Sequence, residues 1–134
     1  MRLSLAYPPS TNRLWRHQRG RMVVSAEAQA WKQAAVWQAR AVGCPLLAGP
    51  VTVAMILHPR LTKAGKASQI RLDVDGPIKI ALDALQGVAY ANDKQVVRLS
   101  ASIGEPQPEG GLTVDVCPAW PWDGKAEATR EAQP

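Results

Sequence analysis

Two aspartates separated by one residue mark the part of the chain best suited to chemistry. Asp73 and Asp75 flank Val74, and an extended backbone would place both carboxylates on the same side of the chain. Two carboxylates held close together repel each other unless a cation lies between them. Because a site with only oxygen ligands suits a hard cation, this pair indicates an Mg²⁺ site.

Two further residues could complete this site. Lys79 follows Asp75 by four residues, one helical turn, and Asp93 comes after the helix expected here. If the short segment 88–90 returns beside the chain that leads into Asp73, three carboxylates and a lysine converge. Such a set suits phosphodiester hydrolysis, because a metal ion polarises the phosphoryl oxygen and generates hydroxide. The Lys79 ammonium would offset negative charge that develops in the transition state.

The same residues also have ordinary structural explanations. The DxD pair could supply turn and capping residues, and Asn92-Asp93 is a common turn dipeptide. Lys79 and Asp83 are four residues apart and could pair on a solvated helix face. DxD is a weak motif by itself, so spacing alone leaves both explanations open.

The strands that would position the site are predicted from alternation. Apolar residues alternate with others at 2–7 and 51–58, which predicts strands there. Further strands are expected at 22–24, 88–90, 95–103 and 112–116. The segments 8–21 and 59–72 are strongly basic and are expected to be loops. Strands and helices are mixed without regular βαβ alternation. We therefore expect an α+β fold, a mixed sheet flanked by two main helices.

The first helix is expected to begin after Ser25, a residue typical of the N-cap position. Glu27 then lies in the first turn, where its charge suits the helix dipole. The helix should end near Val42, before a glycine and a proline. Its buried side is predicted to contain Trp31, Ala34, Ala35 and Val42.

The second helix follows the DxD pair. Pro77 suits the first helical position, with Gly76 or Asp75 as the cap, and Gly87 suits the position just beyond the end. Its apolar stripe follows the i, i+3, i+4, i+7 spacing and consists of Ile78, Ala81, Leu82 and Leu85. This helix would carry Lys79 close to the acidic pair.

Charge is unevenly distributed along the chain. Residues 1–104 hold fourteen of the sixteen Lys and Arg but only five of the eleven Asp and Glu. A basic body suggests a polyanionic partner such as DNA, although a basic surface can also serve solubility alone. Phosphate contacts are dominated by Arg and Lys, and the candidates here are Asn12, Arg13, Arg16, Arg19, Arg21, Lys63, Lys66 and Arg71.

The remaining composition narrows the class of protein. Cys44 and Cys117, with His17 and His58, match no zinc-finger spacing, so two free thiols are expected. The first residues lack a basic stretch followed by an apolar one, so no signal peptide is expected. The apolar runs are too short for a membrane span to be expected. We expect a soluble, intracellular protein with no membrane partner and no small-molecule cofactor. Residues 1–117 would form one domain and residues 118–134 a flexible acidic tail.

Two separate stretches resemble the RusA family of Holliday junction resolvases. RLDVDGPIKIALDALQGVAYANDKQ (71–95) is similar to the family's central signature: a DxD pair, a Lys, a "DAL" helix, a Gly, and a further acid before a Gln. YPPSTNRLWRH, with VSAEAQAW after it, is similar to the family's opening. The resemblance implies a homodimeric resolvase of four-way DNA junctions, from a bacterial cytoplasm or encoded by a phage. It places the metal-binding carboxylates at Asp73, Asp75 and Asp93 and the catalytic lysine at Lys79.

The chain departs from the family pattern at two positions. Gly76 stands where members often have Asn, and Asn92 stands where many relatives have the first of two consecutive acids. Glycine offers no side-chain amide to orient a carboxylate or touch DNA. These departures predict weaker activity or altered metal affinity with the site retained.

The function predicted from the sequence is Mg²⁺-dependent resolution of four-way junctions by paired, symmetric cuts, in DNA recombination or repair. A two-fold symmetric dimer would match the symmetry of this substrate. The alternative is a noncatalytic branched-DNA-binding protein with a degenerate metal site. Two other possibilities are a nuclease for another branched or flap substrate, and a protein-binding scaffold that uses Trp120 and Trp122.

Overall fold

The computed structural model describes residues 1–9, 15–18, 21–66 and 75–119, with only the backbone of residues 15–18, 21–24 and 75. A four-stranded sheet has the order β1-β6-β4-β5 and consists of β1 (Arg2–Leu5), β6 (Gly111–Pro118), β4 (Val51–His58) and β5 (Val96–Ile103). β4 pairs in parallel with β5 and antiparallel with β6, and β1 pairs antiparallel with β6. This mixed sheet confirms the predicted α+β fold.

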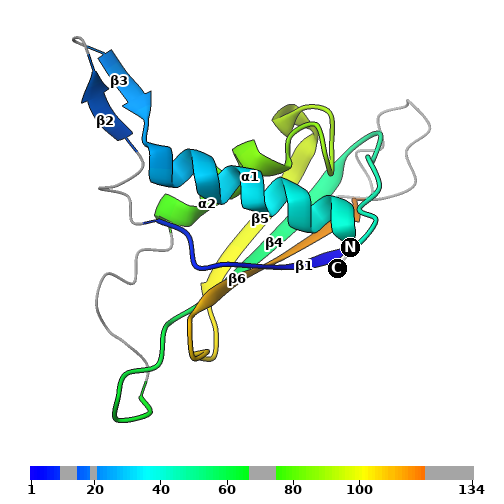
Figure 1. The fold of residues 1–134 in the computed structure, drawn as a ribbon. Coiled ribbons are helices and arrows are strands. Elements are labelled where there is room, and N and C mark those ends of the chain that lie inside the picture. The colour runs from blue at the N-terminus through cyan, green and yellow to red at the C-terminus, as the bar shows by residue number, and fades with distance from the viewer. Residues whose placement is uncertain (10–14, 19–20, 67–74, 120–134) are drawn as a thin grey trace.

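The core lies between the sheet and two helices, α1 (Ala26–Ala41) and α2 (Asp75–Leu85). Both helices cover the same side of the sheet (Figure 1). Alternate residues of β4 are buried against them, as the period-two pattern predicts: Val51, Val53, Met55 and Leu57. Buried residues of both helices and of β1, β4 and β6 belong to one hydrophobic cluster, so the two helices are anchored to a common base.

The first helix begins as predicted but buries a different set of residues. The Ser25 hydroxyl accepts the Ala28 N–H at 3.1 Å, which confirms the N-cap. The buried residues are spaced three or four apart, on one helix face: Ala28, Trp31, Ala35 and Ala39. Ala34 lies off this face, and Val42 lies beyond the last helical residue with 54% of its surface exposed, so both predictions were wrong.

The second helix begins at Asp75, two residues earlier than predicted. Gly76 and Asp75 are therefore helical residues and not caps. Pro77 lies in the first turn, where its missing N–H costs no hydrogen bond because the N–H groups there have no intrahelical partner. Ala81 and Leu85 are buried as predicted, together with Ile80 and Ala84, whereas Ile78 and Leu82 are only partly buried. Gly87 has the positive φ of 87° expected of a residue just beyond a helix end.

Two segments differ from the sequence-based expectation. Residues 15–18, expected in a loop, form β2 (Trp15–Gln18), which pairs antiparallel with β3 (Arg21–Val24) in a hairpin that projects from the start of α1 (Figure 1). Residues 88–90 do not form a strand. The Gly87 N–H donates to the Tyr90 carbonyl at 2.6 Å, which closes a tight turn directly after α2 instead. Tyr90 forms only isolated bridges, to Leu47 and Gln86.

Cys44 and Cys117 are free thiols, as expected. Burial raises the pKa of the Cys44 thiol above its ordinary value. Among the described residues, no helix has the length and apolar character needed to cross a membrane.

Candidate functional site

The described site residues lie on α2 and on the segment that follows it. Asp75 is the first residue of α2, and Lys79 lies one turn further along with its side chain exposed. Asp93 is exposed and begins the short 3₁₀ helix η2 (Asp93–Gln95) that follows α2. Asp73 and the side chain of Asp75 lie outside the described residues. Among the residues that are described, no three His, Cys, Asp or Glu gather as metal ligands, so convergence of the three acids stays a prediction.

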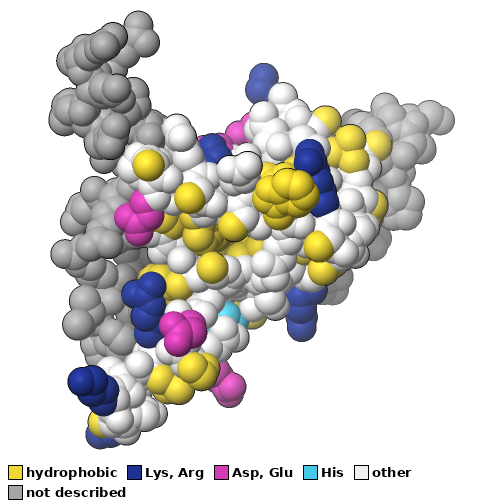
Figure 2. Space-filling view, in the orientation of Figure 1, with side chains coloured by type: hydrophobic (Ala, Val, Ile, Leu, Met, Phe, Trp, Pro, Cys, Tyr) yellow, Lys and Arg dark blue, Asp and Glu magenta, His cyan; other side chains and the backbone are white. Residues whose placement is uncertain are grey.

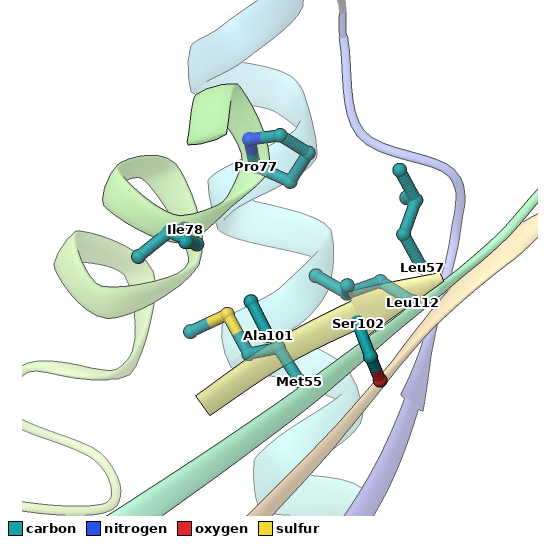
Figure 3. Close-up of a pocket in the computed structure, with 7 residues that line it drawn as sticks. All are labelled: Met55, Leu57, Pro77, Ile78, Ala101, Ser102 and Leu112. Atoms are coloured by element: carbon teal, nitrogen blue, oxygen red, sulfur yellow. The ribbon is translucent and has the colours of Figure 1, made fainter. Parts of the chain in front are cut away.

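The start of α2 faces the sheet with apolar residues. Pro77 and Ile78 line a small hollow over β4 and β5 (Figure 3), whose other lining residues are Met55, Leu57, Ala101, Ser102 and Leu112. Ser102 is the one polar residue in this lining, so the hollow offers no set of metal ligands. The helix that carries Lys79 is anchored by its buried residues in the core cluster: Ile80, Ala81, Ala84 and Leu85.

The turn that carries Asp93 is capped by its neighbours. We call residues 91–95 the Asp93 turn. The Asn92 side-chain oxygen accepts the Lys94 N–H at 2.8 Å, and the Gln95 side chain completes a capping box by bonding back to the Asn92 backbone. The turn thus uses Asn92 as its cap and leaves the Asp93 carboxylate exposed. Asn92 therefore has the turn-forming role that the Asn-Asp dipeptide suggested. Asp93 has no such role in the turn and remains a candidate metal ligand.

Tyr90 joins the Asp93 turn to α2. Its hydroxyl donates a hydrogen bond to the Leu82 carbonyl at 2.7 Å, and its side chain is fully buried. Burial raises the pKa of Tyr90 above its ordinary range, and the nearby charges of Asp93 and Asp83 raise it further.

Asp83 is the acid that the sequence analysis considered only as a partner of Lys79. Both side chains are exposed, and the ion pairs found among the described residues do not join them. Their four-residue spacing places them one turn apart on α2. That spacing drew attention to Asp83 in the sequence. The fold adds that the charges of Asp83 and Asp93 both raise the pKa of Tyr90.

A group of exposed basic residues lies in the loop that follows β4. Arg60, Lys63 and Lys66 are exposed, and the Arg60 guanidinium lies 4.5 Å from the centre of the Tyr7 ring. Figure 2 shows basic and acidic side chains together at this end of the molecule. The loop pairs with the turn between β5 and β6, since the Leu61 N–H donates to the Gln107 carbonyl at 3.0 Å.

The other predicted DNA contacts are only partly described. Arg16 and Arg21 lie on β2 and β3, where the structure describes the backbone alone. Four lie outside the described residues: Asn12, Arg13, Arg19 and Arg71. His17 lies on β2 and is likewise described by its backbone only.

Comparison with known proteins gives one family. Residues 6–117 match the family described as Endodeoxyribonuclease RusA. The chain is 33% identical over 109 residues to the Crossover junction endodeoxyribonuclease RusA of Escherichia coli O139:H28, which covers 81% of this chain and 86% of the relative. It is 36% identical over 96 residues to the protein of that name from Escherichia coli strain K12, covering 71% and 75%. The protein from Enterobacteria phage 82 is 34% identical, also over 96 residues and with the same coverage. These matches confirm the resemblance seen in the sequence.

Proposed function

Because the chain belongs to the RusA family of endodeoxyribonucleases, we propose that it resolves four-way DNA junctions by metal-dependent hydrolysis of two symmetrically placed phosphodiester bonds. Family membership confirms the predicted class, an endonuclease. The observation that carries the finer proposal is the exposed Asp93 carboxylate on a turn that does not need it as a cap. This turn follows Tyr90, whose hydroxyl donates to a carbonyl of the helix that carries Lys79.

The proposed cofactor is Mg²⁺, held by Asp73, Asp75 and Asp93. Three carboxylates present only oxygen donors, which fits a hard divalent cation. Asp93 suits this use because its exposed carboxylate stands on a turn capped by its two neighbours. Bound Mg²⁺ supplies polarisation of the phosphodiester and an activated water. Lys79, exposed on α2, would place its ammonium beside the phosphate and stabilise the charge of the transition state.

We propose a homodimer for this reaction. A four-way junction has two-fold symmetry, and two copies related by the same symmetry would supply two matched sites. We assign residues 1–117 to the nuclease domain and 118–134 to an acidic tail. The relatives come from bacteria and a phage, which supports a cytoplasmic location in a bacterial cell.

The test is cleavage of a synthetic four-way junction beside a linear duplex and a flap of the same sequence. With Mg²⁺ we expect two symmetric nicks in the junction, and none after chelation of the metal. Binding without cutting under all metal conditions would favour the noncatalytic alternative. Equal cutting of flap and junction would favour a nuclease that acts on other branched or flap substrates. If light scattering showed one protein copy bound to each junction, paired cuts by a dimer would be excluded.

The loop after β4 gives a separate prediction about DNA binding. Lys63→Ala with Lys66→Ala is expected to weaken junction affinity and to lower the slope of log affinity against log salt by about one per lysine. Both side chains are exposed, so stability should not change. Fluorescence anisotropy at several salt concentrations measures the slope. The control removes the same charge from α1, with Lys32→Ala and Arg40→Ala. An equal loss in both double variants would mean that total charge, and not this loop, sets the affinity.

A further inference from the structure

The side chain of Gln95 uses all of its hydrogen-bonding capacity to hold two segments together. Its Oε1 accepts the N–H groups of Ala91 at 2.9 Å and of Asn92 at 3.0 Å. Its Nε2 donates to the carbonyls of Leu47 at 3.0 Å and of Gly49 at 2.8 Å. The two N–H groups and two carbonyls fix the orientation of the amide, because a flipped amide would set like groups against each other.

These bonds fasten the Asp93 turn to the chain between α1 and β4. Leu47 and Gly49 precede β4 directly, and the Leu47 N–H also donates to the Ala89 carbonyl at 2.8 Å. On its other side the turn is tied to α2 through Tyr90. Gln95 thus connects the Asp93 turn to the segment that leads into β4, a central strand of the sheet.

The Asp93 backbone carbonyl accepts the Val96 N–H, whereas its side chain has no such anchor among the described residues. Its carboxylate is exposed, and it forms no hydrogen bond or ion pair that the structure records among the described residues. The location of the carboxylate therefore depends on the backbone beneath it. Gln95 lies two residues away. Its Oε1 holds the turn at the N–H groups of Ala91 and Asn92, and its Nε2 fastens the turn to two carbonyls of the chain before β4.

We propose that Gln95 is a positioning residue that holds the Asp93 carboxylate in place for a divalent cation. This inference rests on the proposed function, in which Asp93 is a ligand. Gln95 does not touch the ion and acts through the turn. Groups that orient metal ligands are typically worth about 10–100-fold in metal affinity.

The test is Gln95→Met, which keeps the length of the side chain and removes its polar groups. The Mg²⁺ concentration for half-maximal junction cutting should rise about tenfold or more, while the rate at saturating Mg²⁺ stays close to that of the wild type. Binding of Mn²⁺ to the DNA-free protein, measured by calorimetry, should weaken by the same factor. A purely structural role would instead lower the fraction of active protein without moving either midpoint, and that result would overturn the proposal.

Matched variants keep the test decisive. Gln38→Met makes the same change at an exposed position on α1 and should shift neither midpoint. If Gln95→Met does not fold, Asn92→Ala removes the cap on Lys94 and should shift both midpoints in the same direction, while Asn92→Asp, which keeps the acceptor, should not weaken metal binding. An unshifted Asn92→Ala protein would then reject the proposal. Full cutting by Asp93→Asn would instead remove Asp93 from the proposed metal site, which separates a failure of that premise from a failure of the role given to Gln95.

Discussion

Asp93→Asn is expected to lower Mg²⁺-dependent junction cutting by about a thousandfold or more and to leave junction affinity nearly unchanged. Asparagine keeps the shape of the side chain but loses the negative charge that a divalent cation requires. Metal-assisted stabilisation of a phosphoryl transition state is worth several kcal/mol, and each 1.36 kcal/mol corresponds to about a tenfold change in rate. Single-turnover cutting of a labelled junction measures the loss, and gel-shift titration measures affinity.

The structure allows this experiment to be interpreted without a folding defect. Asp93 is exposed, and the Asp93 turn is capped by Asn92 and Gln95, so the substitution removes no hydrogen bond that the structure shows in the turn. Thermal unfolding without metal should therefore be unchanged. Glu109→Gln neutralises an exposed acid at the far end of the molecule and serves as the control. Cutting by Asp93→Asn at the wild-type rate would remove Asp93 from the proposed site.

Asn92 shows how a departure from the family pattern can have a local structural role. Relatives with an acid at this position were expected to have an additional carboxylate, and its replacement predicted altered metal affinity. The structure gives Asn92 a local role, because its oxygen accepts the Lys94 N–H at the start of the 3₁₀ helix. An aspartate could accept the same bond. The position serves the turn with either side chain, and Asp93 retains its exposure.

The parts of the fold that follow from local periodicity were predictable. Alternation identified β4 and its four buried residues, and the capping preference of serine identified the start of α1. Local rules failed where a residue's neighbours come from elsewhere in the chain. Ala34 looks as apolar as Ala35 in the sequence, and only the way α1 packs decides that Ala35 is buried and Ala34 exposed.

The site residues stay predictions, and the hydrogen bonds that support the Asp93 turn were predictable only in part. The N-x-x-Q spacing of Asn92 and Gln95 resembles a capping box, a pattern that the sequence already contained. The bonds from Gln95 to Leu47 and Gly49 span more than 45 residues and follow no local rule. The bond from Tyr90 to Leu82 likewise depends on the tight turn after α2, where a strand had been expected.

Lys79→Met should slow the chemical step by about a hundredfold or more at saturating Mg²⁺, without a comparable loss of junction affinity. Removal of one preorganised group that stabilises transition-state charge typically costs about 10²–10³ in rate. Methionine keeps most of the apolar stem, and Lys79 is exposed on a helix whose other face is anchored in the core, so α2 should stay in place. Lys79→Arg keeps the charge and should recover part of the rate.

Lys94→Met provides the matched control for this lysine, because Lys94 is exposed and directly follows Asp93. If Lys79 only attracts DNA, both substitutions should weaken affinity by similar amounts and leave the saturated cutting rate unchanged. If Lys79 acts on the reacting phosphate, its loss should lower the saturated rate while the loss of Lys94 does not. The two variants are compared by single-turnover cutting with the junction fully bound, where affinity no longer contributes. Equal saturated rates in both would assign Lys79 to the solvated face of α2.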